Sequence, residues 1–153
     1  MKFKYIISLT KYIFFIAALT SISFPANSEL SVEEIIKGRK ALFSKNYSTA
    51  KRVQTFVIKG DFAKASSLMR EMSKNYITLL EYFPDDTKEG FKTKALPSIW
   101  ENKDEFNNLM KKSSTDMIEL IKVIDSSDDV KATLQKFMWA NCKACHSKYR
   151  AEH

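Results

Sequence analysis

Glycine, proline, cysteine and histidine are all rare in this chain of 153 residues, which contains three glycines, three prolines, two cysteines and two histidines. Few glycines and prolines mean few interruptions, so long helices are expected. No segment shows the sustained alternation of apolar and polar residues that is typical of a half-buried strand. Both cysteines and one of the histidines lie together in the stretch WANCKACHSKYR, Trp139 to Arg150.

An apolar run long enough to cross a membrane is also missing from the N-terminus. The stretch YIFFIAALTSISF is shorter than the roughly 20 residues that a bilayer requires. It follows a lysine-rich start and precedes PANS, which places the small residues Ala26 and Ser28 at the −3 and −1 positions of a cleavage site. An uncleaved anchor is the alternative, and the short run disfavours it. We therefore expect a signal peptide over residues 1–28 and one domain over residues 29–153, exported to a bacterial periplasm without stable membrane insertion.

A dense cluster of basic residues is absent from the expected mature chain. Cleavage removes three lysines and no acidic residue, which lowers the formal charge from +7 to +4. This charge does not indicate nucleic-acid binding. It is compatible with a weak, electrostatically steered encounter with an acidic redox partner protein.

Apolar residues recur at steps of three and four residues, the period of an amphipathic helix. The first such segment begins at Ser31, with two glutamates in its first turn, and ends at Lys59-Gly60-Asp61, where Asp61 can cap the next helix. The other segments cover about 62–83, 100–125 and 128–149, and a long crossing loop occupies 84–99. The pattern predicts an all-α fold, an antiparallel four-helix bundle.

The CKACH motif allows several kinds of chemistry, which its spacing helps to separate. A disulfide between Cys142 and Cys145 would close a very small ring and stabilise little. A thioredoxin-type pair expects a preceding strand, whereas a helix is expected here. Zinc would need a fourth ligand, and the only other histidine is His153, the last residue of the sequence. Covalent haem attachment uses all three residues, two thiols for the vinyl groups and His146 for the iron. We therefore predict one haem c, with His146 as the metal ligand.

Three stretches of the chain resemble the class II c-type cytochromes, the cytochrome c′ family. They are IIKGRKALF in the first helix, ALPSIWENKDEF at the entry to the third, and CKACHSKYR at the end of the fourth. The resemblance covers the whole expected mature chain. Cytochromes c′ are established four-helix bundles, so the resemblance implies this fold, with the haem attached near its C-terminal end.

The first helix decides the function within this family. Low-spin members place a methionine four residues after an arginine, where it becomes the sixth iron ligand, and cytochromes c′ place an apolar or aromatic residue there. Here the arginine is Arg39 and the residue four further on is Phe43. The resemblance thus implies a five-coordinate iron beneath Phe43. Because phenylalanine donates no hydrogen bond, NO and CO are expected ligands and O₂ is not. The alternative is that Phe43 is an ordinary core residue, with Leu42 or Tyr47 nearer the iron.

Two arginines are further candidates for the haem site. Arg39 either reaches a haem propionate, as its counterpart in the family does, or faces solvent. Arg150 resembles the basic residue beside the proximal imidazole, although a position near a helix C-terminus explains it without any function.

We expect a gas-binding haem protein and no enzyme, since no acid–base or nucleophilic set of residues is visible. A homodimer is a further expectation, because many family members pair through their first two helices. The competing function is electron transfer by a six-coordinate, low-spin haem, with Met69 or Met72 as an unexpected ligand. A structural bundle without haem is a third alternative.

Overall fold

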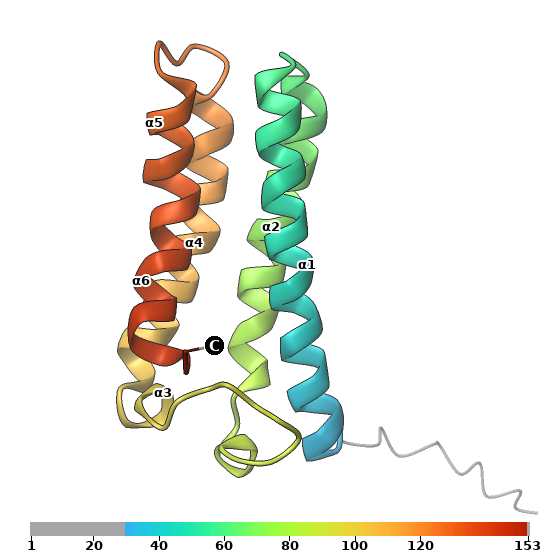
Figure 1. Cartoon of the computed structure of the whole chain (residues 1–153), viewed down its shortest axis with the longest axis vertical. Coiled ribbons are helices and arrows are strands. Elements are labelled where there is room, and N and C mark those ends of the chain that lie inside the picture. Colours follow the sequence, from blue (N-terminus) through green and yellow to red (C-terminus); the bar gives the residue numbers. More distant parts are fainter. Residues whose placement is uncertain (1–29, 153) are drawn as a thin grey trace, which may run out of the picture.

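Residues 30–152 are described by the computed structural model, and long helices dominate them (Figure 1). In chain order the elements are α1 Val32–Ile58, α2 Phe62–Thr78, η1 Leu79–Tyr82, η2 Asp85–Thr87, α3 Ser98–Glu101, α4 Lys103–Val123, α5 Val130–Leu134, η3 Gln135–Trp139 and α6 Ala140–Tyr149. The elements η1 and η2 are 3₁₀ turns, and η3 is a π-helical segment. The prediction of an all-α four-helix bundle is confirmed. The signal peptide predicted over residues 1–28 lies outside the described residues.

The first two helices begin where the sequence predicts, and α1 also ends there. The predicted helix over 62–83 is α-helical only to Thr78 and continues as the 3₁₀ turn η1. Ser31 caps α1 through a capping box, because its side chain accepts from the Glu34 N–H and the Glu34 carboxylate accepts from the Ser31 N–H at 2.9 Å. Gly60 has φ +74°, a left-handed conformation that suits glycine in the turn after α1. Asp61 then caps α2 by accepting from the Lys64 N–H at 3.1 Å.

The third and fourth predicted helices are less regular than expected. The predicted helix over 100–125 is split, because the backbone of Asn102 leaves the helical region between α3 and α4. The predicted helix over 128–149 is one continuous arm, but its middle, η3, winds as a π-helix. Such segments insert an extra residue into the helical winding and are frequent at functional sites.

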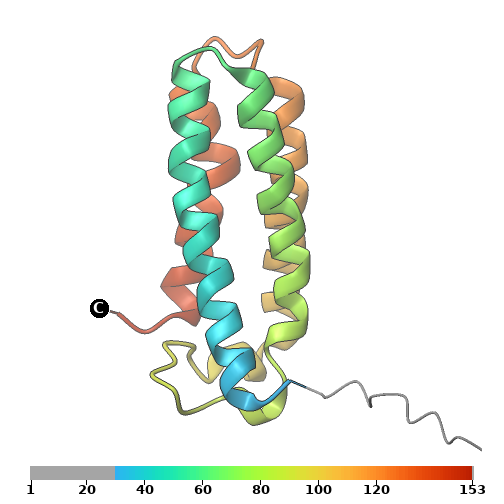
Figure 2. The ribbon, with the colours of Figure 1, turned by 90° about the vertical axis from the view of Figure 1, so that its right-hand side faces the viewer.

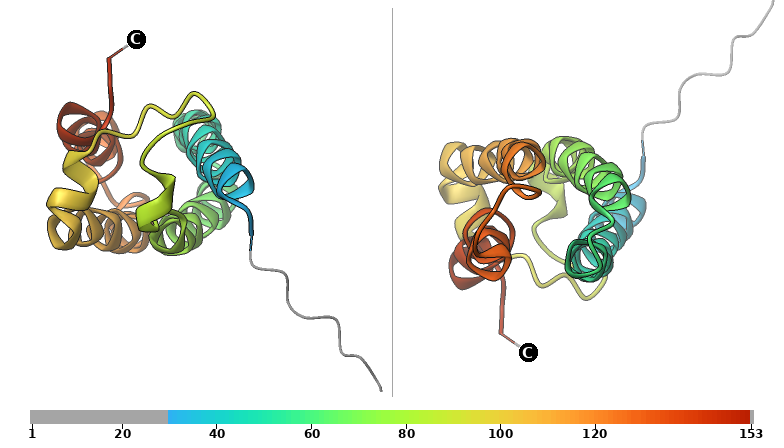
Figure 3. Two further views of the ribbon diagram at one scale, coloured as in Figure 1. Left: turned by 90° about the horizontal axis from the view of Figure 1, so that it is seen from below. Right: turned by 90° about the horizontal axis from the view of Figure 1, so that it is seen from above.

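The four arms pack around one core, with each arm beside two others. Figure 2 shows α1 and α2 side by side, and the end views in Figure 3 show the arms at the corners of a four-sided bundle. Extensive contacts join α1 to α2, α2 to α4, and α4 to η3 and α6. Buried methionines fill much of the interior between them, namely Met69, Met72, Met110, Met117 and Met138. Methionine suits this position, because its flexible, unbranched side chain fills irregular gaps in a core.

The segment between η1 and α3 crosses one end of the bundle, as predicted for 84–99 (Figure 3). The part of this segment next to α3 pairs with the end of the last arm. The Leu96 N–H donates to the Tyr149 carbonyl at 3.1 Å, and the Ala151 N–H donates to the Lys94 carbonyl at 2.9 Å. The crossing loop therefore ties α6 to the end of α2. Within residues 30–152, none of the helices has the length and apolar character needed to cross a membrane.

Candidate haem site

The two cysteine thiols lie on α6, three residues apart and turned toward the bundle interior. Both are free and half-buried, and Cys145 packs against the hydrophobic core. His146 follows directly and lies on the exposed side of the same helix. The CKACH motif therefore lies at the boundary between the interior and the surface. A group attached to both thiols would have its attached edge buried in the bundle.

The surroundings of the thiols favour the protonated form. Burial raises the pKa of the Cys145 thiol to about 12. Burial also raises the pKa of Cys142, and an interaction with the Tyr76 hydroxyl on α2 partly offsets this. Reactive cysteines need a lowered pKa, and thiol redox chemistry is accordingly not favoured here.

One aromatic contact fixes the height of α1 relative to the haem motif. The Tyr47 and Trp139 rings meet edge to face, with their centroids 6.3 Å apart. Because α1 and the last arm run in opposite directions (Figure 1), a step of four residues back from Tyr47 corresponds to a step of four residues forward from Trp139. Phe43 is therefore at the level of the residues between Cys142 and Cys145.

The side of the bundle between α1 and α6 is the one with the least helix–helix packing. Among the described elements, α1 meets the last arm through α5 and through the contact of Tyr47 with Trp139, and no extensive α1–α6 contact is present. The two thiols on α6 and Phe43 on α1 are half-buried. Sparse packing, two thiols three residues apart and an apolar side chain at their level suit a haem attached through the thiols.

A chain of aromatic rings continues from Phe43 across the interior to the end of α6. The Phe43 ring is 6.4 Å from Phe83, Phe83 is 4.7 Å from Phe106, and Phe106 is 5.3 Å from Tyr149. Pairs at these separations stabilise each other beyond their buried area. The ring of Phe43 thus rests on an aromatic cluster that ends at Tyr149, shortly after His146 in the chain.

Arg39 is buried, with only 2% of its surface exposed, so the alternative in which it faces solvent is wrong. One terminal nitrogen donates to the Tyr82 carbonyl at 3.2 Å and the Thr87 hydroxyl at 2.8 Å, and the other donates to the Thr87 carbonyl at 2.7 Å and the Thr93 hydroxyl at 2.8 Å. Its guanidinium also lies 4.7 Å from the centre of the Phe83 ring. Burial lowers its pKa to about 10. Arg39 therefore fastens the crossing loop to α1.

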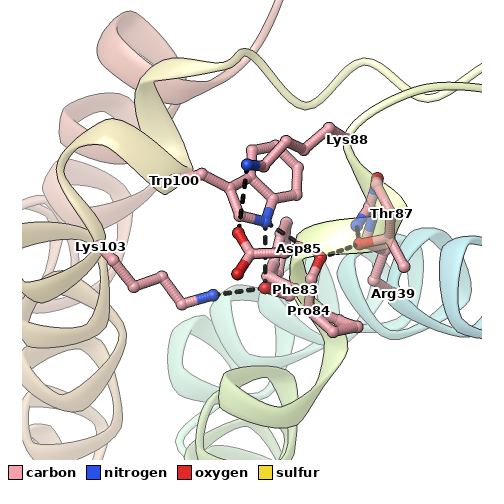
Figure 4. Close-up of polar contacts among 8 residues, drawn as sticks. All are labelled: Arg39, Phe83, Pro84, Asp85, Thr87, Lys88, Trp100 and Lys103. Atoms are coloured by element: carbon pink, nitrogen blue, oxygen red, sulfur yellow. Dashed lines mark hydrogen bonds and ion pairs between the residues drawn. The ribbon is translucent and has the colours of Figure 1, made fainter.

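Trp100 lies at the same end of the bundle as the crossing loop (Figure 4). Its indole N–H donates to the carbonyls of Phe83 at 3.1 Å and Pro84 at 3.0 Å, and the Lys103 ammonium donates to the Phe83 carbonyl at 2.6 Å. These bonds satisfy the carbonyls left over where η1 ends, so Trp100 has a structural role at this end of the bundle.

Arg150 lies just beyond α6, in an extended conformation that pairs its backbone with Ala95. The helix ends at Tyr149, so helical spacing from His146 does not place the Arg150 side chain beside the imidazole. Arg150 is half-buried.

Sequence reasoning missed three polar residues of this region as contributors to the site: Asn46, Tyr76 and Asn141. Asn46 and Asn75 hydrogen-bond between α1 and α2, at 2.8 Å. Asn141 donates to the Phe137 carbonyl in η3 and to the Asp116 carboxylate on α4, each at 2.8 Å. The available signal was an asparagine on the apolar stripe of a helix, where a hydrophobic residue is expected.

Comparison with known proteins identifies relatives over most of the chain. The family model described as Cytochrome C′ matches residues 34–150. A cytochrome c′ from Rhodopseudomonas palustris is 29% identical over 122 residues, which are 78% of this chain and 83% of that protein. A solved cytochrome c′ from the same species has a TM-score of 0.64 at 28% identity, over 77% of this chain and 96% of that one.

Two other similar proteins are a cytochrome c-556 and a cytochrome c′ with bound nitric oxide. A cytochrome c-556 from Agrobacterium fabrum is 30% identical over 90 residues, 59% of this chain and 60% of that protein. A nitric oxide complex of a cytochrome c′ variant from Alcaligenes xylosoxidans has a TM-score of 0.66 at 23% identity, over 81% of this chain and 99% of that one. At this low identity, the similarity to the Alcaligenes xylosoxidans protein shows the fold alone.

Proposed function

This chain belongs to the cytochrome c′ family and carries haem c, and on that premise we propose that it binds NO or CO at a five-coordinate haem iron. In this proposal Cys142 and Cys145 hold the porphyrin, His146 is the iron ligand, and Phe43 lines the opposite, distal face. The bound haem supplies an iron with one position open to a diatomic gas.

The observation that carries the proposal is the identity of Phe43 together with its height on α1. Phe43 lies at the level of the haem motif, where a methionine thioether would reach the iron, and α1 contains no methionine. A phenyl ring has no lone pair to offer as a ligand. Its contact with Phe83 holds it in place, so it excludes water and large ligands from the distal face.

The two arginines have indirect roles in this proposal. Arg39 holds the crossing loop against α1 through Thr87 and Thr93, which keeps one end of the haem site closed. We retain a contact from Arg39 to a haem propionate only as a proposal, since both of its terminal nitrogens already donate within the protein. Arg150 anchors the chain beyond α6 against the loop.

The biological setting follows from the sequence. We propose export to the periplasm after cleavage near residue 28, a role in binding or buffering NO, and no enzymatic activity. We also propose an acidic redox partner and a homodimer that forms through α1 and α2. The charge of the expected mature chain supports the partner, and the exposed outer faces of α1 and α2 are available for pairing.

Optical and resonance Raman spectra of the holo-protein, oxidised and reduced, with and without NO, test this proposal. We expect a high-spin, five-coordinate spectrum that shifts on addition of NO. Phe43→Met should convert it to a low-spin, six-coordinate spectrum, whereas the matched variant Leu42→Met, at the neighbouring position of α1, should leave it high-spin.

A wild-type spectrum that is low-spin, six-coordinate and indifferent to NO would overturn the proposal. The protein would then be an electron-transfer cytochrome, the function that the sequence leaves as the competitor. Replacement of Met69 or Met72 by leucine would identify the sixth ligand.

A further inference from the structure

The interior of α1 contains an amide group that lacks a partner for half of its hydrogen-bonding capacity. Asn46 is 3% exposed and lies on the same apolar stripe as Phe43 and Ala50, one helical turn from each. Its Oδ1 accepts from Asn75 Nδ2 at 2.8 Å, but its own Nδ2 is buried without a hydrogen-bond partner among the described residues.

An unsatisfied buried donor is costly. Leaving such a group without a partner costs about 1–3 kcal/mol, whereas an apolar side chain of similar size costs nothing of this kind. Most buried polar groups in folded proteins are paired, so an exception requires an explanation. Phe43 and Ala50, one turn to either side of Asn46, are both apolar. The position of Asn46 therefore indicates a hydrogen-bond acceptor that the polypeptide itself does not supply.

The location of Asn46 connects it to the haem motif. On α1 it is three residues from Phe43, toward the contact of Tyr47 with Trp139. On the neighbouring α2, its partner Asn75 is followed by Tyr76, whose hydroxyl interacts with the Cys142 thiol. Asn46, Asn75 and Tyr76 are thus buried on α1 and α2, helices that lie side by side in Figure 2, and Tyr76 links them to the haem motif.

We propose that Asn46 Nδ2 donates a hydrogen bond to the gas that binds beneath Phe43, and that Asn75 is a positioning residue that fixes the orientation of the Asn46 amide. This inference rests on the proposed function, because it needs a ligand at the distal face. Phe43 makes that face apolar and narrow, and Asn46 adds one polar point at its edge.

The consequence is a preference among diatomic ligands. A donor stabilises the ligand whose outer atom carries the greater negative charge, and one hydrogen bond changes affinity by up to about tenfold. NO and O₂ gain from it more than CO does. The site then supports O₂ better than Phe43 alone predicts, and its discrimination between gases is set by two residues of α1.

The test compares the CO adducts of the reduced holo-protein by infrared spectroscopy. A donor near the bound ligand draws electron density toward the CO oxygen and lowers the C–O stretching frequency. We expect Asn46→Leu to raise this frequency and to accelerate NO dissociation by up to about tenfold. Asn75→Leu should broaden the band and shift it part of the way, because the Asn46 amide is then free to rotate.

The matched control is Thr49→Val, which replaces another buried polar residue of α1, one turn further along the helix. Thr49→Val should leave both the C–O stretching frequency and the rate of NO dissociation unchanged. Equal frequencies in wild type, Asn46→Leu and Asn75→Leu would overturn the inference while leaving gas binding intact. Failure of the wild-type protein to bind CO at all would instead overturn the proposed function. If Asn46→Leu does not fold, the comparison of wild type with Asn75→Leu still decides the matter.

Discussion

The two ends of the bundle are built from different side chains. The closed end is the one with the α1–α2 turn and the α4–α5 link (Figure 1). Its buried residues are aliphatic, namely Val57, Ala65, Leu68, Leu120, Ile124 and Leu134. The opposite end, here the haem-motif end, contains a buried arginine, a chain of aromatic rings and two thiols.

The connections differ in the same way. A tight turn with one left-handed glycine joins the helices at the closed end, whereas the crossing loop at the haem-motif end needs Arg39 to hold it and places Phe91 and Lys92 at positive φ. Left-handed conformations are unfavourable for residues with a side chain. The closed end therefore supplies stability, and the haem-motif end gives up some of it to form a binding site.

The largest expected effect concerns the haem-motif end alone. Replacing Cys142 and Cys145 together by serine removes both attachment points, so we expect no haem to remain on the denatured chain. Haem staining after denaturing electrophoresis and the pyridine haemochrome spectrum measure this directly. The exposed neighbour Ser147, changed to alanine, is the control and should keep full haem content. Haem retained by the double variant would contradict the assignment.

The second prediction removes packing from the closed end. Leu120 is fully buried, so Leu120→Ala should lower the free energy of unfolding by about 2–5 kcal/mol, the loss from burial plus a cavity. The haem spectrum should not change, because the site is at the other end. Val123→Ala, at a position that is 37% exposed, should cost less than about 0.5 kcal/mol. Urea titrations decide, and a changed spin state in Leu120→Ala would show that the ends are not independent.

The third prediction concerns the π-helical segment next to the haem motif. Asn141 satisfies the Phe137 carbonyl and reaches Asp116 on α4, so Asn141→Ala should cost about 1–3 kcal/mol. It should also shift the haem spectrum, because Asn141 fixes the winding of the chain just before Cys142. Asn108→Ala, at an exposed position of α4, is the matched control. Loss of stability without any spectral shift would make Asn141 a purely structural residue.

The closed end was the easier of the two to predict from the sequence. There Gly60 and Asp61 act through local geometry, as Ser31 does at the start of α1, and a capping or turn residue carries that information in its own type. At the haem-motif end the CKACH motif is equally local, and its residue types and spacing indicated haem once a disulfide, a thioredoxin-type pair and zinc had been disfavoured. Apolar residues at steps of three and four likewise determined which faces became the core.

The haem-motif end depends on contacts between residues far apart in the chain, and those were missed. The solvent-facing alternative for Arg39 failed because its partners, Thr87 and Thr93, lie in a loop whose path no periodicity reveals. The hydrogen bond from Asn141, next to η3, to Asp116 likewise joins two helices that are distant in the sequence. Asn46 carried a signal, since it interrupts an apolar stripe, but its partner Asn75 could be recognised only once α1 and α2 were side by side.

A fourth, smaller effect should appear with pH in the protein prepared without haem. The ordinary pKa of a thiol is 9.0, and burial raises that of Cys145 to about 12 in the folded state. The unfolded chain therefore loses this proton first, so stability is complete below pH 9 and falls as the pH rises from about 9 to 12. Between about pH 8 and pH 10.5, the urea midpoint of unfolding should fall more steeply in the wild type than in Cys145→Ala. Parallel slopes would contradict the burial of this thiol.

The smallest effect is expected at the surface of the haem-motif end. Lys148 forms an ion pair with Glu105 at 2.6 Å, but both side chains are about half exposed, at 45% and 53%. Solvent screens such a pair, so Lys148→Ala should lower stability by less than about a fifth of the loss in Leu120→Ala. A double-mutant cycle with Glu105→Ala, repeated in high salt, measures the coupling, which should vanish as the salt rises. A large coupling that survives salt would mean that surface charge, and not the buried aromatic cluster around Phe83 and Phe106, holds α6 in place beside α4.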